Sequence, residues 1–238
     1  MRTFREFREI FNTPAFYILA AIFLALSGYK FYSLLISYTD LLSMYPDYIF
    51  GTEVKQLSDI DVNKFLFPKL FEFYSYMIVV AVPVLSSSLG HERLYELDKL
   101  ELSASNVTEL SLIIRKLLFV CSIFFVLFIP TLIYPLFLSV FTPVDWGLLL
   151  SSYIGVILLA FMLASLCIPV GLSRINFTVS VFLNLVLVIA TFVYFFEPLF
   201  SSFWFGIVRL SITLFIVVFS LAFLFFARRI YVSTRIFG

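Results

Sequence analysis

Long apolar runs, separated by short polar stretches, make up most of the chain. A helix needs about 20 apolar residues to cross the hydrocarbon core of a bilayer. The pattern therefore predicts an all-α integral membrane protein, a single transmembrane domain over residues 1–238 with six transmembrane helices. The predicted spans are residues 15–36, 70–89, 117–138, 147–170, 177–196 and 205–227. We expect the second span to be kinked or broken near Pro83, because proline removes a helical hydrogen bond.

The residues before the first span have the pattern of a short amphipathic helix over 2–12. Its apolar face is formed by Phe4, Phe7, Ile10 and Phe11. Its charged positions are Arg2, Arg5, Glu6, Arg8 and Glu9. Such a helix is expected to lie in the membrane interface. The alternative is a polar N-terminus with a frayed backbone.

Residues 90–116 form a long charged segment between spans two and three. Its ionisable residues are His91, Glu92, Arg93, Glu96, Asp98, Lys99, Glu101, Glu109, Arg115 and Lys116. The segment must lie in water, because each Asp, Lys or Arg at the centre of a span costs roughly 2.5 to 3.5 kcal/mol.

The first part of this segment, residues 92–102, favours a short helix lying across the cytoplasmic face. Asn106 and Glu109 then have the spacing of a capping box, which predicts a new helix that continues into span three. The short helix is either a rigid element that docks into another protein or part of a solvated loop without a partner.

The basic residues predict the orientation, since short cytoplasmic loops are rich in Lys and Arg. With the N-terminus inside, the inner segments hold Arg2, Arg5, Arg8, Arg93, Lys99, Arg115, Lys116, Arg174, Arg228, Arg229 and Arg235. The outer segments and outer span ends hold Lys30, Lys55, Lys64, Lys69 and Arg209. Both termini are therefore predicted to be cytoplasmic. The acidic outer segment, residues 37–69, is expected to rest on the outer interface, with a gating lid as the alternative.

The sequence contains few motifs that could catalyse a reaction or bind a nucleotide or a metal ion. None of the eight glycines precedes a lysine, so there is no Walker A motif, and the single histidine lacks partners at zinc-site spacing. With 62% hydrophobic residues, 13% charged residues and a net charge of +1, the composition is that of a membrane protein and does not indicate nucleic-acid binding. We therefore expect no catalytic, metal or cofactor site in this chain.

The predicted spans hold few ionisable residues, and Lys30, Glu72 and Arg209 are expected near their outer ends. Proton relays and ion pathways need charged groups within the membrane, so an ion-coupled carrier is disfavoured. Uncharged polar residues at depth are expected to form hydrogen bonds between helices, or else to contact a substrate. They are Ser122, Thr131, Ser151, Ser165, Asn184 and Thr191.

Four motifs, in chain order, resemble the permease subunits of ABC-2-type exporters, in particular the group associated with gliding motility. They are residues 11–18 (FNTPAFYI) with 26–28 (LSG), 83–85 (PVL) before Glu92-Arg93, 145–147 (DWG) with 153–155 (YIG), and 171–174 (GLSR). Three departures fall between spans two and three. Ser86-Ser87-Ser88 replaces a threonine-methionine-arginine run, Glu96-Leu97-Asp98 stands where a Gly-Thr pair is expected, and no proline precedes span three near Asn106.

The resemblance implies a half-transporter in a prokaryotic inner membrane. Two copies, or this chain and a paralogue, would pair, and each would dock a cytoplasmic ABC ATPase that binds ATP and Mg. The expected docking residues are Glu92, Arg93, Glu96, Asp98, Lys99 and Glu101, with Arg5 and Arg8 as a second set. The family exports lipids, polysaccharides and drugs, and nothing in this sequence indicates which of these is the substrate. The rival hypothesis is a non-transporting membrane scaffold or sensor with the same fold.

Overall fold

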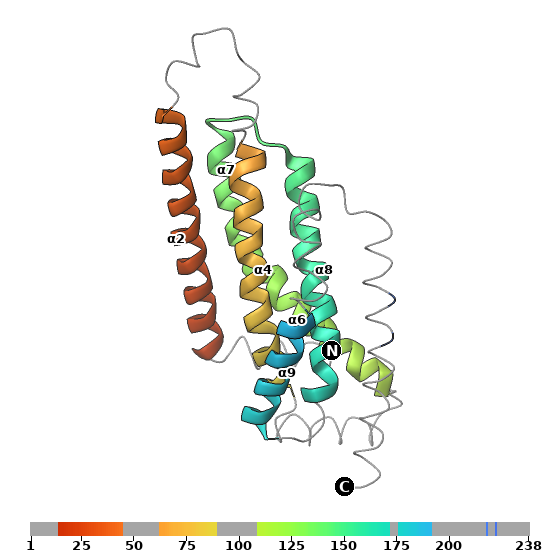
Figure 1. Ribbon diagram of the computed structural model, residues 1–238. Helices are drawn as coiled ribbons and strands as arrows, with labels where there is room; N and C mark the ends of the chain where they lie inside the picture. Colours follow the sequence, from red (N-terminus) through yellow and green to blue (C-terminus); the bar gives the residue numbers. More distant parts are fainter. Residues whose placement is uncertain are drawn as a thin grey trace.

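The computed structural model describes residues 14–44, 62–89, 109–171 and 176–191, together with Val218 and Ala222. Every regular element in this part of the chain is helical (Figure 1). The elements are α2 (Pro14–Met44), α4 (Val62–Ser88), α6 (Glu109–Phe128), the 3₁₀ helix η3 (Pro130–Leu132), α7 (Ile133–Ser139), α8 (Trp146–Gly171) and α9 (Phe177–Thr191).

Four stretches of these helices are long and apolar enough to cross a membrane. They are Phe16–Asp40, Phe65–Ser88, Ile113–Ser139 and Trp146–Gly171, with Phe177–Thr191 as a shorter apolar helix. The prediction of an all-helical protein with several helices that could cross a membrane is confirmed. The predicted N-terminal helix, the short helix within residues 92–102 and nearly all of the predicted sixth span lie outside the described residues.

The first two spans are longer than predicted. α2 continues to Met44 and α4 already begins at Val62, so both ends of the predicted outer segment 37–69 are helical. Polar side chains on the extension of α2 bond to their own helix: Ser37 Oγ donates to the carbonyl of Ser33 at 3.0 Å and Thr39 Oγ1 to that of Ile36 at 2.8 Å. A polar, non-periodic sequence can therefore remain helical beyond the apolar run that sequence reasoning detects.

Proline acts differently in the second and third spans. α4 runs through Pro68 and Pro83 as one helix, so of the two predicted alternatives at Pro83, a kink or a break, the break is wrong. The third span is interrupted, because α6 ends at Phe128 and η3 follows from Pro130. Pro130 has no N–H to donate to the preceding turn, which favours the change from α to 3₁₀ geometry at this point.

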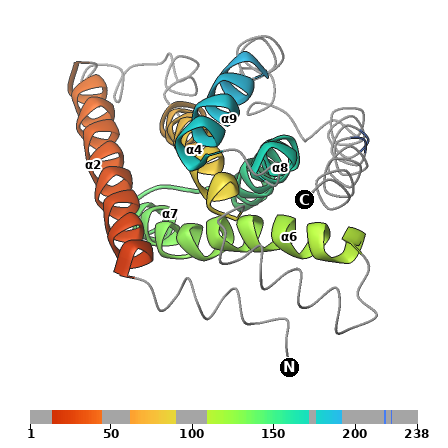
Figure 2. The same cartoon turned by 90° about the horizontal axis from the view of Figure 1, so that it is seen from below.

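α8 packs against α4, α6 and α9, while α2 lies at the edge of the described helices against α4 (Figures 1 and 2). Most of α8 is buried, including the small residues Gly155, Ala160, Ala164 and Gly171. Gly171 permits the closest approach of two helices, since a Cβ there would overlap with the carbonyl oxygen of Ser86 in α4 and lie 3.1 Å from its carbon. Small residues at such crossings are a regular feature of membrane helix packing.

A polar network marks the end of the bundle where α4 and α8 begin. Asp145 caps α8: its Oδ1 accepts from the N–H groups of Gly147 at 3.0 Å and Leu148 at 3.1 Å. Asn63 of α4 accepts from the N–H of Asp145 at 2.8 Å and donates to the carbonyl of Pro143 at 3.2 Å. This network fixes the α7–α8 connection to α4 and defines a polar rim.

Candidate functional site

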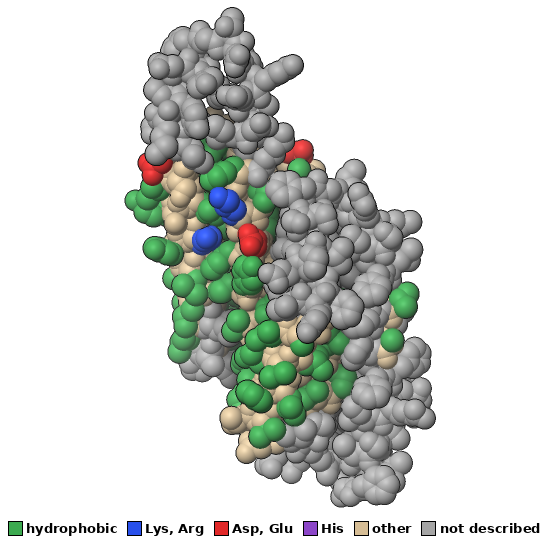
Figure 3. All heavy atoms as spheres, in the orientation of Figure 1, with side chains coloured by type: hydrophobic (Ala, Val, Ile, Leu, Met, Phe, Trp, Pro, Cys, Tyr) green, Lys and Arg blue, Asp and Glu red, His purple; other side chains and the backbone are tan. Residues whose placement is uncertain are grey.

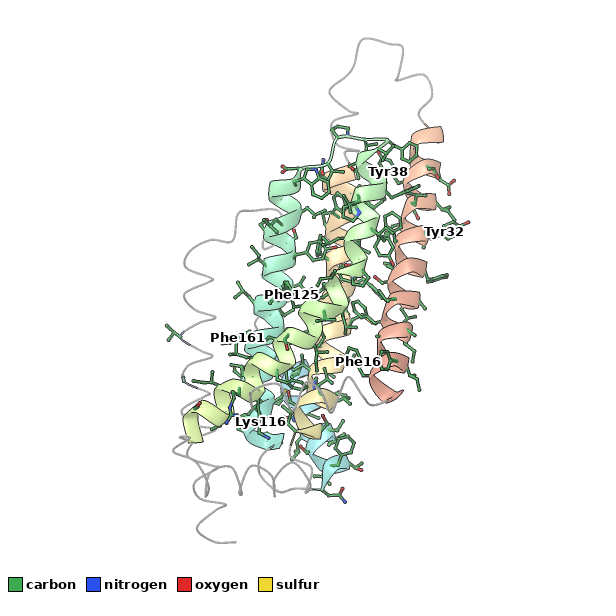
Figure 4. All side chains as sticks on the ribbon, turned by 180° about the vertical axis from the view of Figure 1, so that it is seen from behind. Phe16, Tyr32, Tyr38, Lys116, Phe125 and Phe161 are labelled. Carbon is green, nitrogen blue, oxygen red and sulfur yellow. The ribbon has the colours of Figure 1, made fainter. Side chains whose placement is uncertain are left out.

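A buried lysine joins the end of α4 to the start of α6. Lys116 is 1% exposed, and its Nζ donates to the carbonyl of Leu89 at 3.2 Å. The last carbonyls of a helix have no partner within it, and a lysine near a helix C-terminus both bonds to them and complements their partial negative charge. Figure 4 shows Lys116 near the beginning of α6, at the opposite end of the bundle from Tyr38. The end of α4 is therefore bonded to the first part of α6, so the two helices that bracket residues 90–108 are connected.

The same end of α4 is bonded to α9. Ser87 Oγ accepts from Ser180 Oγ at 3.1 Å and from Asn184 Nδ2 at 2.9 Å, and all three side chains are buried. A side-chain hydrogen bond between membrane helices contributes about 0.6 kcal/mol on average and up to about 1.7 kcal/mol. With the close contact of Gly171 and Ser86, this places α4, α6, α8 and α9 in one connected assembly around the end of α4.

Four helical segments meet at a second buried polar group near the middle of the described helices. Ser27 Oγ of α2 donates to Tyr74 OH of α4 at 3.0 Å, and Thr131 of η3 lies 3.0 Å from Tyr153 OH of α8. Thr131 Oγ1 also donates to the carbonyl of Phe128 at 2.7 Å. The hydroxyl of Thr131 thus holds the interruption of span three against α8.

Aromatic rings enclose these hydroxyl groups. The ring of Phe128 lies 5.3 Å from that of Tyr74 and 6.0 Å from that of Tyr153, and the rings of Phe71 and Tyr153 are 4.8 Å apart in an edge-to-face arrangement. All of them are buried. The result is a closely packed junction that connects α2, α4, η3 and α8.

Thr131→Val tests this junction. Valine has nearly the same shape but leaves Tyr153 OH without its partner, so we expect the free energy of unfolding to fall by about 1 kcal/mol. Thermal unfolding in detergent, followed by circular dichroism, measures the change. Ser139→Ala is the control, since Ser139 is exposed and bonds to the carbonyl of its own helix residue Leu136. Equal unfolding midpoints for Thr131→Val and Ser139→Ala would show that the contact with Tyr153 adds nothing.

The predicted docking residues lie outside the part of the chain that the structure describes. These are Glu92, Arg93, Glu96, Asp98, Lys99, Glu101, Arg5 and Arg8. The described residues supply the ends to which the first six are attached, Leu89 and Glu109 onward. Lys116 was assigned to this segment from the sequence as a charge that orients the chain, and its burial at the end of α4 was not predicted. A lysine within the apolar run LIIRKLLFV is the signal that could have indicated it.

The expectation that polar residues at depth bond between helices is confirmed for two of the six. Thr131 bonds to Tyr153 and Asn184 to Ser87. The hydroxyl groups of the others, Ser122, Ser151, Ser165 and Thr191, donate to carbonyls of their own helices, so for these four the expectation stays a prediction. Ser and Thr satisfy themselves within a helix by this local bond, whereas the Asn side chain reaches farther. Tyr74 and Tyr153, which sequence reasoning did not single out, also form hydrogen bonds between helices, with Ser27 and Thr131.

Two charged residues lie within the candidate spans. Lys30 belongs to the stretch Phe16–Asp40 and Glu72 to the stretch Phe65–Ser88. The expectation that both lie near the outer ends of their spans stays a prediction.

Among the described residues, no group of three or more His, Cys, Asp or Glu side chains could hold a metal ion. Comparisons of the chain with models of protein families, with curated proteins and with solved structures found no match.

Proposed function

We propose that this chain is the transmembrane permease subunit of an ABC-2-type exporter, which moves its substrate with ATP hydrolysed by a separate cytoplasmic subunit. In this proposal it lies in the inner membrane of a prokaryote with both termini in the cytoplasm, and it pairs with a second copy or a paralogue. The charged residues between α4 and α6 would bind the ATPase. ATP and Mg would be held by that partner.

The observation that carries this proposal is the bond between Lys116 and Leu89. A segment attached to two independent helices could move without displacing either of them. Here the end of α4 is bonded at 3.2 Å to Lys116, about two turns into α6, and Ser87 bonds the same end of α4 to α9. A force applied to residues 90–108 would therefore act on α4, α6 and α9 together, which is what a coupling element requires.

The experiment is co-expression with candidate ATPase subunits from the same organism, purification through a tag on this chain, and measurement of ATP hydrolysis in the eluate. We expect one ATPase to co-purify in about equal amount and to hydrolyse ATP. Recovery of the folded chain without any of the candidate subunits would contradict the proposal.

One observation favours the rival, a non-transporting scaffold or sensor. The junction around Tyr74 and Tyr153 is closely packed, with Ser27, Tyr74 and Thr131 all fully buried. A rigid centre of this kind suits a protein that holds partners in place. If the chain assembles with other membrane proteins but with no ATPase, this alternative replaces the exporter.

A further inference from the structure

Charged side chains lie within the membrane spans on the outer surface of the helices. Lys69 and Glu72 of α4 are exposed, and Lys30 of the neighbouring helix α2 is half-buried. In Figure 3, two basic side chains and one acidic side chain lie together on one face, surrounded by hydrophobic side chains. The same stripe of α4 continues with Tyr76, Val80 and Val84, all exposed, which is the pattern of a face directed at lipid.

The position of these charges along the helices follows from the rise per residue. Asn63, at the polar rim, precedes Lys69 by about 9 Å and Glu72 by about 14 Å along α4, at 1.5 Å per residue. Asp40 of the antiparallel helix α2 lies about 15 Å beyond Lys30 on the same basis. Lys30 and Glu72 are thus at a similar level on adjacent helices, with Lys69 about one turn nearer the rim. The long side chains of the two lysines can extend toward the headgroups, whereas Glu72 has a shorter side chain, so a cationic headgroup has to reach its carboxylate.

The three charges are not neutralised by each other. Lys69 Nζ lies 4.0 Å from the centre of the Phe65 ring, and Glu72 accepts a hydrogen bond from Tyr76 OH at 3.2 Å. Lys30 makes no hydrogen bond or ion pair with any residue that the structure describes, and neither lysine forms an ion pair with Glu72. Charges within a bilayer are rare on the lipid-facing side, because they cost several kcal/mol without a counter-charge.

From this arrangement we infer that Lys30, Lys69 and Glu72 form a binding site for a phospholipid headgroup that carries both a phosphate and a primary ammonium, as in phosphatidylethanolamine. The phosphate would lie between the two lysines, and the ammonium would donate to Glu72. The acyl chains would lie along the apolar stripe that follows Tyr76 on α4. The site does not depend on whether the chain binds an ATPase.

Charge complementarity selects this headgroup over others. A lipid with a phosphate and no cation would satisfy the lysines but would leave Glu72 unpaired beside an anion. A choline headgroup has a cation without N–H groups, so it cannot donate a hydrogen bond to the carboxylate. A primary ammonium supplies three donors and pairs with the acceptor that remains on Glu72.

The test is native mass spectrometry of the delipidated full chain after incubation with phosphatidylethanolamine, phosphatidylglycerol or phosphatidylcholine of identical acyl chains. We expect preferential retention of phosphatidylethanolamine. The double variant Lys30→Met, Lys69→Met should retain at least tenfold less of it, and Glu72→Gln should lose the preference over phosphatidylglycerol. Tyr29→Phe is the matched control: Tyr29 is 72% exposed, adjacent to Lys30 in sequence, and should leave retention unchanged.

Three results would overturn the inference. The first is equal retention of the three lipids by the unaltered chain. The second is unchanged retention of phosphatidylethanolamine by the double variant. The third is loss of a dimer from the spectrum of the double variant while lipid retention persists, which would assign this face to contact with a second copy. Both lysine substitutions replace a surface charge with an apolar side chain, and a thermal unfolding curve in detergent verifies that the variant remains folded.

Discussion

Gly171→Ala is expected to lower the free energy of unfolding by about 1 to 3 kcal/mol, although alanine is normally the better helix former by about 1 kcal/mol. The added methyl group would overlap with the carbonyl oxygen of Ser86, and a backbone carbonyl cannot rotate away as a flexible side chain can. α4 and α8 would have to separate at the end of α4, where Ser87 is bonded to α9. The midpoint of thermal unfolding in detergent, followed by circular dichroism, measures the loss.

Gly147→Ala is the matched control on the same helix. A Cβ at Gly147 lies 3.3 Å from Oδ1 of Asp145, the end of an exposed side chain that can shift by a few tenths of an ångström. We expect this variant to unfold at nearly the temperature of the unaltered protein. If Gly171→Ala is as stable as Gly147→Ala, the close crossing of α4 and α8 is incorrect.

Lys116→Glu is expected to destabilise the protein by on the order of 3 kcal/mol, because it buries an uncompensated charge of the wrong sign. The ammonium that donates to the carbonyl of Leu89 would be replaced by a carboxylate facing the negative end of the α4 dipole. Thermal unfolding in detergent again provides the measurement.

Lys116→Met separates the effect of charge from that of packing. Methionine occupies a similar volume without a donor or a charge. Lys116→Met should therefore lower the free energy of unfolding clearly less than Lys116→Glu does. Lys116→Glu with the stability of the unaltered protein would contradict the burial of Lys116 at the end of α4.

The sequence predicts the described helices well where the apolar run itself sets the boundary. α8 agrees with the predicted fourth span to within about a residue at each end, because Asp145 caps its start and the apolar run ends at the same place as the helix. α2 and α4 extend past their apolar runs, since Ser37 and Thr39 bond to their own backbone and α4 tolerates two prolines. The length of an apolar run indicates the part of a helix that crosses the hydrocarbon core, and not the full length of the helix.

Features that depend on contacts between distant residues could not be predicted. The partners Lys116 and Leu89 are 27 residues apart, and Ser87 and Asn184 are 97 apart. The sequence shows that Lys116 stands within an apolar run, but only the packed structure shows that its ammonium bonds to the end of α4.

The central claim is that the charged segment between α4 and α6 is the docking site for an ATPase. The measurement that tests it most directly is co-purification of the ATPase with the unaltered chain and with the variant Glu92→Ala, Arg93→Ala, Glu96→Ala. In this proposal the three residues contact the ATPase and not the membrane helices, so both chains should unfold at similar temperatures. We predict at least about a tenfold loss of bound ATPase, equivalent to about 1.4 kcal/mol of binding free energy. Equal recovery of the ATPase by the variant and by the unaltered chain would contradict the claim.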